Sequence, residues 1–109
     1  RNATHPLNAM LNYAYAVLHA HIQIQVLSAG YDPRLGVLHE TRDDALAFVL
    51  DMMEPFRSVV DAAVFKFALS AAFSAKDFLL SDTGVCRLTP QLARRVTQEV
   101  SRVLTLKSI

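Results

Sequence analysis

A long uncharged stretch opens the chain, and its apolar residues recur at helical spacing. No Asp, Glu, Lys or Arg lies between Pro6 and Tyr31. One apolar stripe consists of Leu7, Leu11, Ala14, Leu18 and Ile22, and it is widened by Met10, Val17, Ile24 and Leu27. A helix that is apolar on more than one side is typical of the centre of a bundle. The pattern predicts a helix that begins near Thr4 and ends at Gly30.

This first segment is long enough to span a membrane, but polar side chains interrupt it throughout. They are Asn8, Asn12, His19, His21, Gln23 and Gln25. Such side chains are costly in the hydrocarbon core of a bilayer, so the pattern indicates a helix packed inside a protein. We therefore expect no membrane partner.

A second helical period follows a turn-rich connector at residues 30–36. We expect this helix to begin around Thr41 or Asp43, because acids in a first turn suit the helix dipole. Its expected core face consists of Leu46, Val49, Leu50, Met53, Phe56, Val60, Val64 and Phe67. Pro55 lies inside this pattern and lacks a backbone donor, so we expect a kink, or a break into two helices, just after Glu54.

Irregular residues separate this helix from the last one, and a short hairpin is expected there around residues 82–84. Thr89 followed by Pro90 is typical of a helix start, a cap and then a proline. The apolar face of the last helix consists of Leu92, Val96, Val100 and Val103. Together these elements predict an all-α fold, a helical bundle with a short hairpin near residues 78–88.

The composition indicates the size and class of the protein but says little about its function. With 109 residues, 52% of them hydrophobic, the chain has enough apolar content for one modest domain. Its single cysteine, Cys86, cannot form an internal disulfide, which favours a reducing cytoplasm. The net charge of +1 gives no general argument for nucleic-acid binding. The chain begins at Arg1 without a leader sequence, so we expect a fragment of a longer protein.

Charge is distributed unevenly along the chain. The acidic residues of the middle are Glu40, Asp43, Asp44, Asp51, Glu54 and Asp61. The basic residues of the last quarter are Arg87, Arg94, Arg95, Arg102 and Lys107. An acidic site beside a basic segment suits metal-dependent phosphate chemistry, although solvated helix faces give the same pattern.

One group of residues carries the candidate chemistry. His39 leaves a loop rich in glycine and proline, and Asp51 and Glu54 follow at i and i+3 on one face of the second helix. An imidazole and two carboxylates form a mixed nitrogen and oxygen set that suits Mn²⁺ or Mg²⁺ better than structural zinc. The alternative is an ordinary ion pair between Glu54 and Arg57, also at i+3. The residues alone leave both interpretations open.

Other side chains are weaker candidates. His19 and His21 differ by two positions and therefore face different sides of a helix, so each is expected to be packed or hydrogen-bonded. His5 is expected to be a surface or capping residue. Tyr13 and Tyr15 are expected in the core.

Four segments of the chain, taken in order, match the motif pattern of one known family. Residues 6–18, Pro-Leu-Asn-Ala-Met-Leu-Asn-Tyr-Ala-Tyr-Ala-Val-Leu, are similar to the first motif of its helical domain. Residues 30–40, which end in Gly-Val-Leu-His-Glu, are similar to its histidine-bearing loop. Residues 50–57, Leu-Asp-Met-Met-Glu-Pro-Phe-Arg, are similar to its acidic helix, and residues 87–89 to the start of its terminal helix. Together these segments resemble the CRISPR-associated spacer-acquisition integrases, the Cas-one endonuclease family.

This resemblance implies the helical catalytic domain of a homodimeric, metal-dependent DNA integrase and nuclease of CRISPR adaptive immunity, an antiviral defence. In that family the 3′-hydroxyl ends of prespacer DNA attack phosphodiesters of the CRISPR repeat by transesterification, helped by the small Cas-two partner protein. The resemblance assigns His39 and Glu54 as ligands of Mn²⁺ or Mg²⁺ and places Asp51 in the same catalytic metal site. Its candidate phosphate contacts are Arg57, Arg87, Arg94 and Arg95.

Two family features have no counterpart in the chain, namely another metal-binding glutamate on an earlier helix and a β-rich N-terminal domain that carries dimer contacts. We therefore expect residues 1–109 to be the C-terminal α-helical catalytic domain of a longer enzyme, catalytically incomplete when alone. Two alternatives remain. One is a non-catalytic helical interaction or scaffold module, and the other is a stand-alone metal-dependent hydrolase of small phosphate esters.

Overall fold

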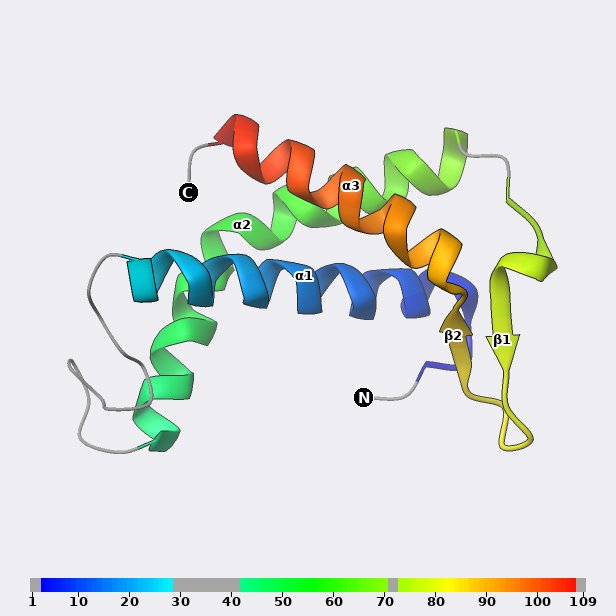
Figure 1. Cartoon of the computed structure of the whole chain (residues 1–109), viewed down its shortest axis with the longest axis horizontal. Coiled ribbons are helices and arrows are strands. Elements are labelled where there is room, and N and C mark those ends of the chain that lie inside the picture. The colour runs from blue at the N-terminus through cyan, green and yellow to red at the C-terminus, as the bar shows by residue number, and fades with distance from the viewer. Residues whose placement is uncertain (1–2, 29–41, 71–72, 108–109) are drawn as a thin grey trace.

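The computed structural model describes residues 3–28, 42–70 and 73–107, in which helices pack beside one small hairpin (Figure 1). The helices are α1 (Pro6–Ser28), α2 (Arg42–Ser70) and α3 (Pro90–Lys107). A 3-10 turn, η1 (Ala75–Asp77), leads into the strands β1 (Phe78–Leu80) and β2 (Cys86–Leu88). Each helix contacts the other two, so the predicted all-α bundle with a hairpin near residues 78–88 is confirmed. The connector at residues 30–36 and His39 lie outside the described residues.

His5 caps α1, which begins two residues after the predicted start at Thr4. The Nδ1 atom of His5 accepts a hydrogen bond from the Leu7 N–H at 3.1 Å, and its carbonyl oxygen accepts one from the Ala9 N–H at 2.9 Å. The first bond satisfies a backbone donor that a helix start leaves open, and Pro6 has no donor to satisfy. The expectation of a surface or capping histidine is therefore confirmed.

α1 packs against both other helices, and one row of its side chains is fully covered. This buried row consists of Met10, Ala14, Leu18 and Ile22. Ile24, predicted to widen the apolar stripe, is instead 61% exposed. It lies two residues beyond Ile22 and so projects from a different side of the helix. No helix in the described ranges is long and apolar enough to cross a membrane.

α2 is a single unbroken helix that contains Pro55. Of the two alternatives expected after Glu54, the break is wrong, and the kink agrees with Figure 1, in which the helix changes direction along its length. A proline inside a helix removes one backbone donor and crowds the preceding turn, which is a recognised cause of bending. The helix continues beyond this point because apolar residues on both sides of Pro55 are packed in the same core.

The buried face of α2 is narrower than the sequence pattern predicts. Its buried residues are Val49, Met53, Val60, Ala63 and Val64, and Phe56 and Phe67 are half-buried beside them. Leu50, predicted to lie in the core, is 46% exposed. It follows Val49 directly, and consecutive residues project about 100° apart around a helix, so both cannot face the same neighbour.

Thr89 caps α3 as predicted. Its Oγ1 atom accepts a hydrogen bond from the Leu92 N–H at 3.3 Å, and its carbonyl oxygen accepts one from the Ala93 N–H at 2.9 Å. The buried row of α3 consists of Leu92, Val96, Val100 and Leu104. Val103, predicted to end this row, is half-buried, because the spacing of four residues continues to the helix end.

The hairpin is antiparallel, with Phe78 opposite Leu88 and Leu80 opposite Cys86. Its turn is closed by a hydrogen bond of 3.0 Å from the Gly84 N–H to the Ser81 carbonyl. Gly84 has a φ of +84°, a backbone conformation that favours glycine. The other edge of β2 is bonded to the start of the chain, where the Cys86 N–H donates to the Ala3 carbonyl at 2.7 Å.

Three phenylalanines join the hairpin to the helices. The rings of Phe67 on α2 and Phe73 are stacked at a centroid separation of 5.9 Å. Phe73 in turn meets Phe78 of β1 edge to face at 6.0 Å. Both arrangements are favourable for aromatic pairs. Phe78 of β1 therefore anchors the hairpin on the bundle, in addition to the contacts of β2 with α1 and α3.

We predict that Leu18→Ala lowers the free energy of unfolding by about 2–5 kcal/mol, because it deletes a fully buried side chain and leaves a cavity. Urea denaturation followed by helical circular dichroism measures the change. Ile24→Ala is the matched control on the same helix and should change the stability by less than about 0.5 kcal/mol. Equal losses for the two variants would contradict the observed packing of α1.

Candidate metal and nucleic-acid site

Asp51 and Glu54 lie one turn apart on the outer side of α2. Both side chains are exposed, as are their neighbours Leu50 and Met52, whereas Met53 is buried. In the sequence, Asp51 and Glu54 each follow a residue of the expected core face, Leu50 and Met53, and burial of a carboxylate there would be costly. The structure removes that cost, because the acidic turn faces solvent and can meet a diffusible ligand directly.

Arg57 forms the ion pair with Glu54 that the spacing predicts. Its Nη1 atom lies 3.1 Å from Oε2 of Glu54, and the two side chains are 45% and 64% exposed. An exposed pair of this kind contributes about 0–1 kcal/mol to stability. The pair also raises the pKa of Arg57, chiefly through its hydrogen bond to Glu54.

The donor chemistry of the acidic turn fits a hard divalent cation. Carboxylate oxygens are the ligands that Mg²⁺ and Mn²⁺ prefer, and Asp51 and Glu54 supply them from adjacent turns. Within the described residues, Arg57 bonds the Glu54 carboxylate through Oε2 alone. The third predicted ligand, His39, lies outside the described residues, and among those described no three His, Cys, Asp or Glu side chains form a cluster.

Tyr15 connects α1 to this acidic turn, a contact that the sequence pattern does not predict. Its hydroxyl donates a hydrogen bond to Oδ1 of Asp61. The guanidinium carbon of Arg57 lies 4.7 Å from the centre of the Tyr15 ring, which is a cation–π contact. The chain Tyr15–Arg57–Glu54 therefore links the two helices. A tyrosine in an uncharged helix needs a polar partner for its hydroxyl from another element. This requirement is the one feature of the sequence that could have predicted the contact.

The surroundings of Tyr15 raise its pKa above the ordinary value of 10.0. Burial is the largest cause, followed by the hydrogen bond to Asp61 and the negative charge of that residue. Arg57 acts in the opposite direction by favouring the phenolate. Tyr15 therefore stays protonated in the folded chain beyond the pH at which an unfolded tyrosine ionises.

The two histidines of α1, His19 and His21, are both half-buried. Nε2 of His21 lies 3.2 Å from the hydroxyl oxygen of Ser101 on α3, so the expectation of a hydrogen-bonded histidine is confirmed. Neither belongs to a cluster of metal-ligating side chains in the described ranges.

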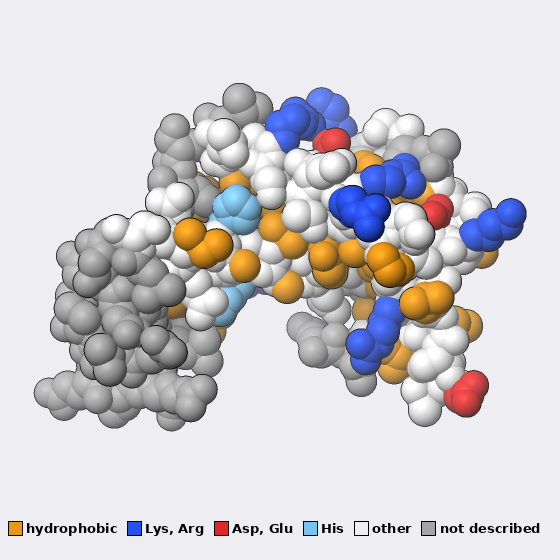
Figure 2. All heavy atoms as spheres, in the orientation of Figure 1, with side chains coloured by type: hydrophobic (Ala, Val, Ile, Leu, Met, Phe, Trp, Pro, Cys, Tyr) orange, Lys and Arg blue, Asp and Glu red, His pale blue; other side chains and the backbone are white. Residues whose placement is uncertain are grey.

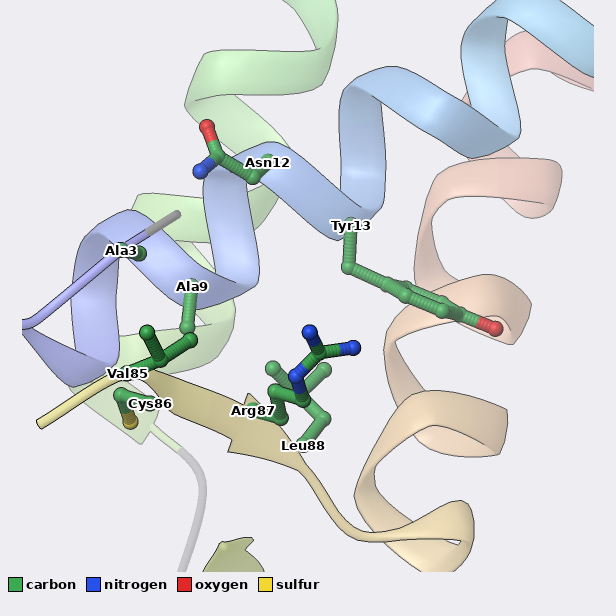
Figure 3. A pocket seen from close by; sticks show the side chains of 8 residues that line it. All are labelled: Ala3, Ala9, Asn12, Tyr13, Val85, Cys86, Arg87 and Leu88. Atoms are coloured by element: carbon green, nitrogen blue, oxygen red, sulfur yellow. The ribbon is translucent and has the colours of Figure 1, made fainter. Parts of the chain in front are cut away.

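A pocket of about 460 Å³ lies between the start of the chain, α1 and β2. Figure 3 shows the Arg87 side chain extending from β2 into the space between Ala9 and Tyr13, with the Tyr13 ring directed toward α3. The Tyr13 hydroxyl accepts a hydrogen bond of 3.3 Å from Thr97. Tyr13 is 36% exposed at the pocket rim, so its predicted place in the core is wrong.

Basic side chains gather on one face of the molecule. Figure 2 shows Lys and Arg side chains over α3 and beside the hairpin. Arg94 is exposed on α3, whereas Arg95 is half-buried with its guanidinium 5.4 Å from the centre of the Phe67 ring. Arg102 is paired with Glu99 at 2.8 Å. Arg87 and Arg94 are thus the two more accessible of the predicted phosphate contacts on this side.

We predict that Asp61→Asn lowers the pKa of Tyr15 toward 10.0, because two of the three causes that raise it come from the Asp61 carboxylate. Alkaline titration of tyrosinate absorbance measures the change. The part of the absorbance change that is missing in Tyr15→Phe belongs to Tyr15. Asp82→Asn in the hairpin turn is the control.

The sign of the stability effect follows from linkage. Because folding raises the pKa of Tyr15, this residue adds to the free energy of unfolding. The added stability is fully present below pH 10.0 and is lost as the pH rises through the folded-state pKa. A Tyr15 component that titrates identically in wild type and Asp61→Asn would contradict the described hydrogen bond.

Comparison with known proteins gives the family. The family model described as CRISPR associated protein Cas1 matches residues 1–102. Among curated relatives, CRISPR-associated endonuclease Cas1 1 of Methanospirillum hungatei is 36% identical over 87 residues, covering 79% of this chain and 26% of the relative. Another, from Pyrobaculum aerophilum, is 33% identical over 109 residues, covering 93% and 36%. The chain therefore spans roughly a quarter to a third of the length of these relatives.

A solved structure gives the same result. A casposase bound to an integration product superposes with a TM-score of 0.80 at 36% identity, over 94% of this chain and 30% of that chain. The likeness thus covers the helices and the hairpin together. Because the family model spans almost the whole sequence, the chain belongs to the Cas1 family of CRISPR-associated proteins.

Proposed function

We propose that the chain is the C-terminal helical part of a metal-dependent DNA endonuclease and integrase of CRISPR adaptive immunity. The curated relatives are named CRISPR-associated endonucleases, and the solved neighbour is a casposase bound to an integration product. The observation that carries the proposal is the acidic turn. Asp51 and Glu54 are exposed one turn apart on α2, inside the segment that the family model matches.

In this proposal His39, Asp51 and Glu54 hold Mn²⁺ or Mg²⁺. When bound, such a cation polarises a phosphodiester and neutralises charge that develops on the leaving oxygen. Asp51 and Glu54 supply carboxylate oxygens from the rigid helix α2, and His39 supplies an imidazole nitrogen. Arg57 restrains the Glu54 carboxylate through Oε2.

The proposed reaction is a transesterification. The 3′-hydroxyl of prespacer DNA attacks a phosphorus atom of the CRISPR repeat, forming one P–O bond while another P–O bond breaks. The leaving 3′-oxygen takes up a proton, and the number of phosphodiesters is unchanged. The chemistry therefore needs positioning and charge stabilisation but no external energy source.

The basic face supplies the proposed DNA contacts. The net charge of +1 is too small to attract DNA through the chain as a whole, so binding depends on where the arginines lie. Arg87 projects into the pocket beside β2, and Arg94 is exposed on α3. We assign Arg87 and Arg94 to phosphate contacts. The other two candidates, Arg57 and Arg95, lie against the aromatic rings of Tyr15 and Phe67.

The remaining parts of the proposal concern the longer protein. It acts in the cytoplasm as a homodimer, with the Cas-two protein as its partner and with prespacer and repeat DNA as its substrates. The competing function is a helical scaffold, and the exposed Glu54–Arg57 pair is the observation that favours it, because a simple surface ion pair needs no metal. Mutation of the acidic turn separates the two functions.

We predict that His39→Ala and Glu54→Gln each abolish Mn²⁺-dependent cleavage and strand transfer by the full-length protein on branched DNA. Removal of a residue that only hydrogen-bonds a metal ligand lowers activity by up to roughly 100-fold. Removal of a ligand itself should lower the activity by more than this. Glu99→Gln is the matched control, since Glu99 also forms an exposed i,i+3 pair with an arginine, on α3. Wild-type activity in Glu54→Gln would instead support the scaffold function.

We also predict that Arg94→Ala weakens DNA binding in a salt-dependent way. Loss of one phosphate contact should reduce the slope of log affinity against log salt concentration by about one. Fluorescence anisotropy with labelled duplex at several salt concentrations measures this slope. Gln98→Ala replaces a neutral, exposed side chain on the same helix and should leave the slope unchanged. An unaltered slope for Arg94→Ala would remove Arg94 from the interface.

A further inference from the structure

Tyr15 contacts two charged residues of α2 that lie one turn apart. Its hydroxyl donates to Asp61, and its ring lies under the guanidinium of Arg57, four residues earlier. The ring is therefore fixed at one end by a hydrogen bond and carries a cation on its face. This geometry restrains an arginine side chain that is 45% exposed.

A second glutamate–arginine pair shows that the ion pair alone does not require such support. Glu99 and Arg102 on α3 have the same i,i+3 spacing and meet at 2.8 Å. In the described part of the chain, aromatic rings carry Arg57 and Arg95 but not Arg102. Arg57 thus has an anchor that ordinary helix pairing does not explain.

The anchor reaches the acidic turn through one more contact. Nη1 of Arg57 bonds Oε2 of Glu54 at 3.1 Å, and the Glu54 side chain is 64% exposed. A long, exposed carboxylate samples many rotamers, and a partner that is itself mobile restrains it poorly. A partner held on a fixed ring restrains it better, because less freedom is lost when the bond forms.

We propose that Tyr15 is a positioning residue for the metal site, acting through Arg57 to hold the Glu54 carboxylate in the orientation that a divalent cation requires. This inference rests on the proposed function, in which Glu54 is a metal ligand. Tyr15 contributes neither a ligand nor a proton. Tyr15 is held in place by α1, because the residue before it, Ala14, is fully buried. Through Arg57, it restrains a ligand that is exposed on α2.

Direct Mn²⁺ binding to the full-length protein without DNA tests the inference. Electron paramagnetic resonance of the free aquo ion gives the affinity. We expect Tyr15→Leu and Arg57→Leu each to weaken Mn²⁺ binding by about 10–100-fold, the range for loss of a partner that orients a metal ligand. Tyr15→Phe keeps the ring but loses the hydroxyl that fixes it, so its affinity should lie between those of the wild type and Tyr15→Leu. Tyr13→Leu alters the other tyrosine of α1, which contacts Thr97, and should bind as the wild type does.

A double variant separates positioning from general packing. If Tyr15 acts through Arg57, Tyr15→Leu should cause no further loss in a background that already carries Arg57→Leu. Additive losses would overturn the inference. Wild-type affinity in Tyr15→Leu or in the exposed Arg57→Leu would also overturn it, provided that Glu54→Gln loses Mn²⁺. If Glu54→Gln itself binds Mn²⁺ as the wild type does, the proposed metal site fails instead.

Discussion

Burial of α1, a helix without a single charged side chain, is the constraint on which the positions of the other elements depend. Ala14 and Leu18 are completely covered. Removing apolar surface from water is favourable by roughly 25 cal/mol per Å², so α2 and α3 turn their apolar faces to α1 and to each other. Their charged faces are then left pointing outward. The exposed acidic turn of α2 and the basic face of α3 are thus consequences of packing three apolar faces into one core.

The polar side chains of α1 determine how the covering helices align. Within the described residues, Tyr15 bonds Asp61 of α2, while Tyr13 and His21 meet Thr97 and Ser101 of α3. Polar groups near a core are costly without partners, so each contact favours one alignment over its neighbours. These specific pairs select a single register, and that register brings Asp61 and Arg57 to Tyr15.

Local patterns in the sequence predicted the helices and the hairpin well, but they predicted the contacts between these elements poorly. The cap at Thr89 and the turn glycine at Gly84 depend on neighbouring residues only, and both were predictable. Side chains at the margins of apolar stripes were assigned wrongly, as Leu50 and Ile24 show, because periodicity gives the centre of a face but not its width. The contact of Tyr15 with Arg57 joins residues on two different helices, so only the packed structure could show it. His39 lies outside the described residues, and its place in the site stays a prediction.

Pro55 has an electrostatic consequence as well as a geometric one. In a regular helix the N–H of residue 55 would bond the carbonyl oxygen of residue 51. Proline has no such donor, so the backbone oxygen of Asp51 loses the partner that would neutralise part of its dipole. This peptide dipole lies in the same turn as the carboxylates of Asp51 and Glu54. The backbone thereby adds negative potential at a turn whose side chains already include two carboxylates, and Arg57 compensates only part of it through its pair with Glu54.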